Sequence, residues 1–91
     1  MGRKTAKRWI IKGIVQGVGF RFFVQHKANA LGITGWVRNR NDGSVEVYAV
    51  GPESRLSDLS GALHIGPSSA EVRSVEEREE RVENYAEFAI R

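Results

Sequence analysis

The chain has 91 residues, of which 41% are hydrophobic, 27% are charged and none is cysteine, and its formal net charge is +3. This length suits one domain with a modest core and leaves no room for a second. The lack of cysteine excludes a disulfide framework, a thiol nucleophile and a thiolate metal site, and no apolar run approaches the roughly 20 residues that span a bilayer. We therefore expect a monomeric, cytoplasmic globular domain without membrane association.

The charge is distributed unevenly along the sequence. Residues 1–40 contain nine Lys or Arg and no Asp or Glu, whereas residues 41–91 contain five basic and eleven acidic residues, so the two halves carry +9 and −6. The excess of positive charge in the first half favours an anionic ligand there. Four of the nine basic residues crowd the N-terminus, and we interpret residues 1–6 as a basic, flexible tail ahead of a domain covering residues 7–91.

The first third of the chain predicts a strand, a glycine-containing loop and a helix. A short run rich in β-branched and aromatic residues indicates a strand from about Lys7 to Gly13. Apolar residues then recur at helical spacing from Phe20 to Leu31, and Gly32 is placed to cap that helix. The loop between them is residues 14–19.

The middle of the chain predicts a β-hairpin followed by a second helix. Strands are expected at Ile33–Arg40 and Ser44–Val50, and Asn41-Asp42-Gly43 between them is a strong hairpin turn signal. Gly51-Pro52 ends the second of these strands and opens a helix with an apolar stripe, which Gly66-Pro67 ends.

The last part of the chain predicts two more strands. The segment from Ala70 to about Val82 is almost wholly charged after Val75, and we interpret it as an edge strand that projects past the core, with disorder of its charged part as the alternative. Tyr85–Arg91 is expected to form a short final strand. The order is βαββαβ plus a fifth strand, which predicts an α+β, ferredoxin-like two-layer sandwich with an antiparallel sheet and two helices on one face.

The loop that joins the first strand to the first helix has the features of an anion site. The N-terminus of a helix leaves N–H groups unpaired and adds partial positive charge, so phosphate or carboxylate fits there. Gly17 and Gly19 allow close backbone approach, and the guanidinium of Arg21 offers a planar fork to phosphate oxygens. A turn whose glycines serve only packing is the alternative. The loop lacks the glycine and lysine spacing of nucleotide-binding motifs.

Asn39, at the end of the second predicted strand, is the other polar residue of interest. Its amide can accept a hydrogen bond from a water and donate one to an oxygen, which would hold a nucleophile in line. Turn chemistry is the alternative, because the hairpin turn follows at once. His26 and His64 have no partners at metal-ligand spacing. A zinc or calcium site therefore has no support in the spacing.

Two stretches of the sequence resemble the signatures of the acylphosphatase family. They are Ile11-x-Gly13-x-Val15-Gln16-Gly17-Val18-x-Phe20-Arg21 and Gly35-Trp36-Val37-Arg38-Asn39-x-x-x-Gly43-x-Val45. Both match position by position, and the likeness covers the chain from about residue 7 to residue 91. The resemblance implies a ferredoxin-like enzyme that hydrolyses the carboxyl-phosphate bond of acyl phosphates to a carboxylate and inorganic phosphate, without metal or cofactor.

The resemblance also implies roles for individual residues. Arg21 matches the phosphate-binding arginine of the family, and Asn39 matches the asparagine that orients the attacking water. The phosphate-binding loop would consist of Gln16, Gly17, Val18, Gly19, Phe20 and Arg21. The partner would be a small-molecule acyl phosphate, with inorganic phosphate as product and competitive inhibitor. We expect the substrate phosphate itself to take the proton of the water, because no nearby carboxylate or histidine is a convincing base.

Two other classes of function compete with this interpretation. An RNA-recognition domain shares the sheet and the basic charge, but its aromatic motif lies on a strand in mid-chain, whereas Phe20 and Phe23 enter the buried stripe of the first helix. No nucleic-acid partner is therefore expected. The second class is an accessory domain that binds acyl or carbamoyl phosphate without turning it over. The presence of both Arg21 and Asn39 argues against that class.

Overall fold

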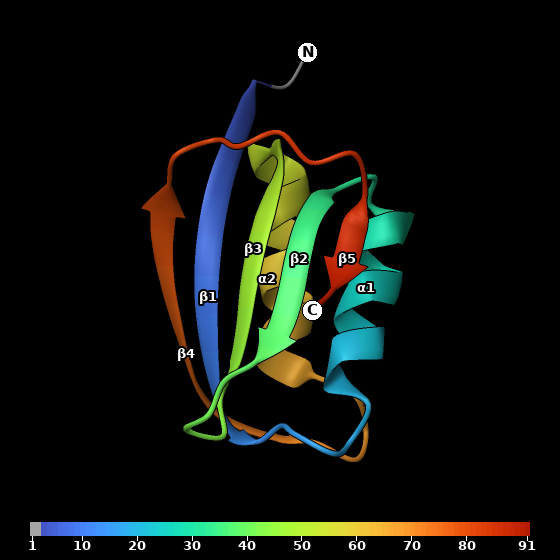
Figure 1. Ribbon diagram of the computed structural model, residues 1–91, viewed down its shortest axis with the longest axis vertical. Coiled ribbons are helices and arrows are strands. Elements are labelled where there is room, and N and C mark those ends of the chain that lie inside the picture. The colour runs from blue at the N-terminus through green and yellow to red at the C-terminus, as the bar shows by residue number, and fades with distance from the viewer. Residues whose placement is uncertain (1–2) are drawn as a thin grey trace.

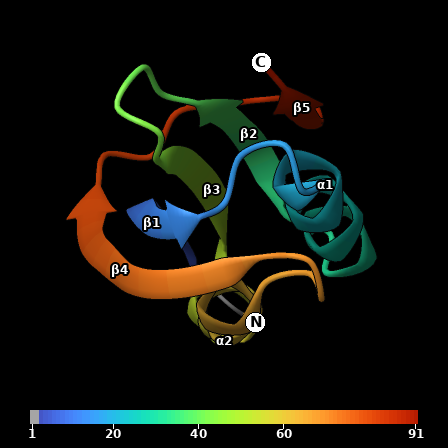
Figure 2. The ribbon, with the colours of Figure 1, turned by 90° about the horizontal axis from the view of Figure 1, so that it is seen from below.

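The computed structural model describes residues 3–91 as one five-stranded sheet with two helices packed against it (Figure 1). The elements in chain order are β1 (Lys4–Ile14), α1 (Phe20–Ala30), β2 (Thr34–Asn39), β3 (Val45–Pro52), α2 (Glu53–Ile65), β4 (Glu71–Glu80) and β5 (Phe88–Ile90). The strand order across the sheet is β4-β1-β3-β2-β5. Both helices cover the same face (Figures 1 and 2). The expected α+β, ferredoxin-like sandwich is confirmed.

Two details of the sheet differ from the expectation. β1 begins at Lys4, because its pairing with β3 continues as far as Lys4 opposite Pro52, so residues 4–6 belong to the sheet, while Met1 and Gly2 lie outside the described residues. β5 pairs with β2 in parallel, with Gly35 opposite Phe88. The sheet is therefore mixed, because the chain crosses from β4 at one edge to β5 at the other before it runs alongside β2 (Figure 1).

The main core lies between the helices and the sheet. Alternate residues of the central strands point into it, as the period of two in the sequence predicted, and each helix contributes an apolar stripe. Its most completely buried large side chains are Trp9, Phe20, Ile11, Ile33, Leu56, Leu59, Leu63, Val15, Val24, Val37, Val45 and Val47. Each buried side chain of this size stabilises the fold by about 1.5–3 kcal/mol. The core between the helices and the sheet therefore fixes the positions of the strands that carry the site.

β4 is an edge strand, as expected, but it does not project past the core. It pairs with β1 along its whole length, from Glu71 opposite Ile14 to Glu80 opposite Ala6. The acidic run of β4 therefore lies beside the basic residues of β1. The side-chain ion pairs across this edge join Lys7 to Glu77 (3.1 Å), Arg8 to Glu80 (2.9 Å) and Lys12 to Glu76 (3.4 Å). Opposite charges from the two halves of the sequence thus meet here.

The face of the sheet opposite the helices carries a small second cluster at one end. Trp36, Tyr48 and Tyr85 pack there with Ala6 and Val50. The crossing segment of residues 81–87 ties itself to this cluster through the Tyr48 hydroxyl, which donates to the Arg81 carbonyl and accepts from the Glu83 N–H. Burial raises the pKa of Tyr48.

Candidate active site

The loop between β1 and α1 exposes a set of backbone N–H groups. Gly17 and Gly19 have φ angles of 73° and 79°, which residues with side chains rarely adopt. Gly19 is also the N-cap of α1, and its carbonyl accepts the N–H of Phe23 at 3.0 Å. Within residues 3–91, no backbone acceptor takes up the N–H groups of residues 16–19. The loop therefore presents hydrogen-bond donors that have no internal partner.

Positive charge accompanies these donors. The first turn of α1 contains no acidic residue, and no side chain caps its N-terminus, so the positive end of the helix dipole is not offset there. Arg21 is the second residue of α1 and is half-buried. Its Nη1 donates to the main-chain oxygen of Arg91 at 3.2 Å, and it takes part in none of the ion pairs formed within the described chain. These groups are available to an anion.

The register of the sheet places the Asn39 side chain beside the loop and Arg21. It is the last residue of β2 and lies opposite Val45, whose side chain is buried in the core under the helices. Directly opposed residues share a face of the sheet, so the Asn39 side chain lies on the helix side. It lines a pocket of about 230 Å³ together with Val15, Gly17, Gly19, Phe20, Arg21 and Phe22. Loop, helix start and strand end thus form one cavity.

Two residues of the expected loop do not line this pocket. Val18 is partly buried against the main core. The Gln16 side chain points to the hairpin instead, where its Nε2 donates to the carbonyls of Arg40 at 2.8 Å and Ser44 at 2.9 Å. Gln16 therefore braces the loop against the hairpin that carries Asn39. The sequence motif marked this position only for its backbone, and the brace depends on a contact between distant segments.

The sequence reasoning did not single out Phe22, which lines the pocket with 70% of its surface exposed. The helical spacing of the sequence could have shown that Phe22 is exposed, because it falls outside the buried stripe formed by Phe20, Val24 and Ala28. Phe22 therefore exposes its ring beside the other lining residues. It gives the rim of the pocket an apolar side.

Asp42 lies in the hairpin turn between β2 and β3, and its hydrogen bonds favour the ionised carboxylate. Its Oδ1 accepts from the Ser44 hydroxyl at 2.5 Å and from the Ser44 N–H at 2.9 Å. These two hydrogen bonds hold the pKa of Asp42 below its usual range. Residues 3–91 contain no group of three His, Cys, Asp or Glu side chains that could hold a metal ion. Among the helices described, none has the length and apolar character needed to cross a membrane.

Comparison with known proteins places this geometry in a family. The family model described as Acylphosphatase matches residues 7–90. A curated acylphosphatase from Solibacter usitatus (strain Ellin6076) is 54% identical over 86 residues, which cover 94% of this chain and 90% of the relative. The solved structure of an acylphosphatase from Coxiella burnetii matches with a TM-score of 0.93 and 40% identity, covering 97% of this chain and 93% of that one.

The same fold also occurs as a small part of a larger protein. Full-length HypF, solved in a phosphate- and nucleotide-bound form, matches with a TM-score of 0.89 and 28% identity, and the match covers 99% of this chain and 12% of that chain. The curated relative and the Coxiella structure, by contrast, are matched over nearly their whole length. The resemblance seen in the two sequence motifs is confirmed, and the chain belongs to the acylphosphatase family, whose members hydrolyse acyl phosphates.

Proposed function

We propose that the pocket between the loop and Asn39 is where this chain transfers the phosphoryl group of an acyl phosphate to water. One observation carries the proposal: unpaired loop N–H groups, the Arg21 guanidinium and the Asn39 amide line the same pocket. In phosphoryl transfer, negative charge is spread over three equatorial oxygens, and catalysis consists mainly of positioning and electrostatic stabilisation. Donors fixed in advance supply that stabilisation without reorganising during the reaction.

The phosphate end of the substrate would bind to the loop and Arg21. Backbone N–H groups and the guanidinium fork donate to the non-bridging oxygens, and the helix dipole favours the negative charge. Water attacks phosphorus as the bond between phosphorus and the acyl oxygen breaks, which releases a carboxylate and inorganic phosphate. A carboxylate is a good leaving group, so the reaction needs no strong general acid and, in this proposal, no metal ion.

Asn39 would place the attacking water. Its carboxamide oxygen accepts one O–H of the water, and its NH₂ group donates to a water or phosphate oxygen. The brace from Gln16 to the Arg40 and Ser44 carbonyls supports a fixed distance between this amide and the loop. We assign the proton of the water to a phosphate oxygen of the substrate, because Asp42 is already committed to Ser44 with a lowered pKa.

The test is hydrolysis of benzoyl phosphate, whose ring suits the exposed Phe22 at the rim. The parent chain should hydrolyse it in the presence of a chelator, with inorganic phosphate as competitive inhibitor. Asn39→Ala should lower kcat by about 100-fold, the usual effect of misplacing a reactant by an ångström. The inhibition constant of inorganic phosphate should hardly change, because the loop and Arg21 remain.

Asn41→Ala is the matched control, since Asn41 lies on the same hairpin and does not line this pocket. It should keep the parent kcat. If Asn39→Ala hydrolyses benzoyl phosphate like the parent, the role given to Asn39 is wrong. If the parent binds inorganic phosphate but hydrolyses no acyl phosphate, the chain is a binding domain and the proposed reaction is wrong.

A further inference from the structure

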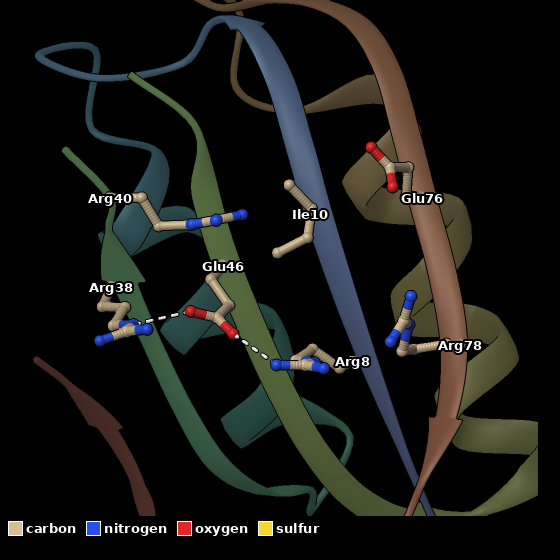
Figure 3. A pocket seen from close by; sticks show the side chains of 7 residues that line it. All are labelled: Arg8, Ile10, Arg38, Arg40, Glu46, Glu76 and Arg78. Atoms are coloured by element: carbon tan, nitrogen blue, oxygen red, sulfur yellow. Dashed lines mark hydrogen bonds and ion pairs between the residues drawn. The ribbon is translucent and has the colours of Figure 1, made fainter. Parts of the chain in front are cut away.

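A second pocket lies on the face of the sheet opposite the helices (Figure 3). Its volume is about 320 Å³, and it shares no lining residue with the candidate active site. We call it the open-face pocket. It is lined by Arg8, Ile10, Arg38, Arg40, Glu46, Glu76 and Arg78.

Four strands and the hairpin turn bring these side chains together. Arg8 lies opposite Arg78 of β4, and Ile10 lies opposite both Glu76 of β4 and Glu46 of β3. Opposed residues point to the same side of a sheet. One row across the sheet therefore consists of Glu76, Ile10, Glu46 and Arg38, and the next row contains Arg78 and Arg8. Arg38 and Arg40 flank Asn39 in sequence, and successive residues point to opposite sides of a strand. The open-face pocket and the active-site pocket therefore lie back to back across β2.

A buried carboxylate orients part of this cluster. Glu46 is 3% exposed, and Figure 3 shows it between two guanidinium groups. Its Oε1 accepts from Arg38 Nε at 2.7 Å, and its Oε2 accepts from Arg8 Nη1 at 3.2 Å. Each guanidinium has five N–H donors, so these bonds fix the position of both groups and leave donors over for a ligand. Glu46 thus contacts two guanidinium groups, and Arg8 is also paired with Glu80, to which its Nη2 donates at 2.9 Å.

The other two arginines have little internal compensation. The nearest carboxylate to Arg40 is that of Asp42, at 4.0 Å, and Arg78 takes part in no ion pair among the residues that the structure describes. Glu76 is paired outside the pocket, with Lys12 at 3.4 Å. The lining of the pocket carries four positive and two negative charges. Its surface is therefore complementary to an anion.

The width of the cluster indicates the shape of that anion. β4 and β2 are separated by β1 and β3, which at about 4.8 Å per strand places their backbones about 14 Å apart. A single phosphate is small relative to this span, whereas a chain of linked phosphates can contact arginines from both ends of it. The neighbouring aromatic ring of Trp36 is already faced by the guanidinium groups of Arg38 and Arg91, at 5.5 Å and 4.8 Å from its centroid. No free ring is offered to a stacking base.

We propose that the open-face pocket binds an oligophosphate, a chain of two or three linked phosphates that is either free or part of a nucleotide. Arg78 and Arg40 would hold its two ends, and Arg8 and Arg38, fixed by Glu46, would hold its middle. The site is separate from the proposed reaction and does not depend on it. Both charge and length select the ligand, since inorganic phosphate matches the charge but not the length.

Calorimetric titration with inorganic triphosphate tests the proposal. The full chain with Arg21→Gln is used, so that the guanidinium of the active-site pocket does not contribute. Triphosphate should bind with a stoichiometry of one, and inorganic phosphate should bind at least about tenfold more weakly, in keeping with the loss of one charge-assisted contact or more. Adding Arg78→Gln or Arg40→Gln should each weaken triphosphate binding by roughly tenfold.

Arg73→Gln is the matched control, because Arg73 is an exposed arginine of the same strand that pairs with Glu71 and does not line the pocket. It should leave triphosphate affinity unchanged, and circular dichroism should show that all variants are folded. Binding of ATP as well as triphosphate would assign a nucleotide as a second source of the ligand, and binding of triphosphate alone would assign the free chain. Equal weakening by Arg73→Gln, no binding once Arg21 is replaced, or retention of an RNA oligonucleotide without triphosphate binding would each overturn the proposal.

Discussion

The basic side chains of β1 and the side chain of Arg21 at the start of α1 differ in what surrounds them. Lys7, Arg8 and Lys12 on β1 are all paired with glutamates of neighbouring elements. Arg21 on α1 has one hydrogen bond to a main-chain oxygen, and the helix turn around it has no acidic residue. A paired cation holds strands together, whereas an uncompensated cation beside unpaired donors is available to a ligand.

This difference changes the meaning of the charge asymmetry in the sequence. By sequence alone, the excess of +9 in residues 1–40 favours an anionic ligand in that half of the chain. Three of these nine basic residues, Lys7, Arg8 and Lys12, are instead paired with glutamates of β4 along the edge of the sheet. The number of basic residues in a segment is therefore a weak indicator of anion binding, and the partners of each residue decide its role.

The largest effect that this comparison predicts is at Arg21. Arg21→Gln should lower kcat/KM for benzoyl phosphate by about 100- to 1,000-fold, as the loss of a donor to developing charge does in other enzymes. Its melting temperature should stay close to that of the parent, because Arg21 forms no ion pair with a described residue. Arg21→Lys should recover only part of the activity, because an ammonium cannot reproduce the planar fork. Undiminished turnover by Arg21→Gln would show that the charge of Arg21 has no part in the reaction.

A smaller effect is expected at Gln16, which connects the loop to the hairpin. Gln16→Leu removes both bonds to the Arg40 and Ser44 carbonyls, so the loop and Asn39 should lose their fixed separation and kcat should fall about ten- to 100-fold. Gln25→Leu is the control, because Gln25 makes a similar tie from α1 to the Phe88 carbonyl at 3.1 Å, and does not line the pocket. Steady-state kinetics of both variants measure the effect, and equal losses of kcat in the two would contradict a special role for Gln16.

Much of the fold could be predicted from the sequence because its signals are local. The alternation of Val45 and Val47, the turn at Asp42-Gly43 and the apolar stripe of α1 each arise from neighbouring residues. The end of β4 could not be predicted in this way. Residues 76–80 are charged on both sides, and they form a strand because β1 supplies cations beside them. The parallel pairing of β5 has no local signal either, since the strand has only three residues.

In the candidate site too, some features follow from the sequence and others depend on contacts between distant segments. The family resemblance pointed to Arg21 and Asn39, and the structure brings these two residues into one pocket, although their chemical roles remain proposals. The brace made by Gln16 and the open-face pocket could not be predicted, because each depends on the register between strands that are distant in sequence. A motif identifies positions that meet a ligand, whereas the contacts that support them appear only in three dimensions.

The smallest expected effect concerns a paired charge, Glu77 on β4, and it should appear in stability alone. Glu77 Oε1 accepts from Trp9 Nε1 and from Ser60 Oγ, both at 2.8 Å, and Oε2 accepts from Lys7 Nζ at 3.1 Å. Burial raises the pKa of this carboxyl, but the three hydrogen bonds lower it further, so the net shift is downward. The stabilisation is therefore complete above the ordinary pKa of about 4.3 and is lost as the pH falls below it towards the folded-state value.

Glu77→Gln should thus lower the free energy of unfolding by about 1 kcal/mol at neutral pH, because the amide oxygen can still accept from Trp9 and Ser60, whereas the charge and the acceptor for Lys7 are lost. The difference from the parent should shrink below about pH 4, and kcat/KM for benzoyl phosphate should not change. Urea titrations at several pH values measure this. Glu79→Gln, on the same strand but without an ion pair to any described residue, is the control and should be neutral. A gap between parent and Glu77→Gln that persisted unchanged in acid would mean that the carboxylate charge does not hold this edge together.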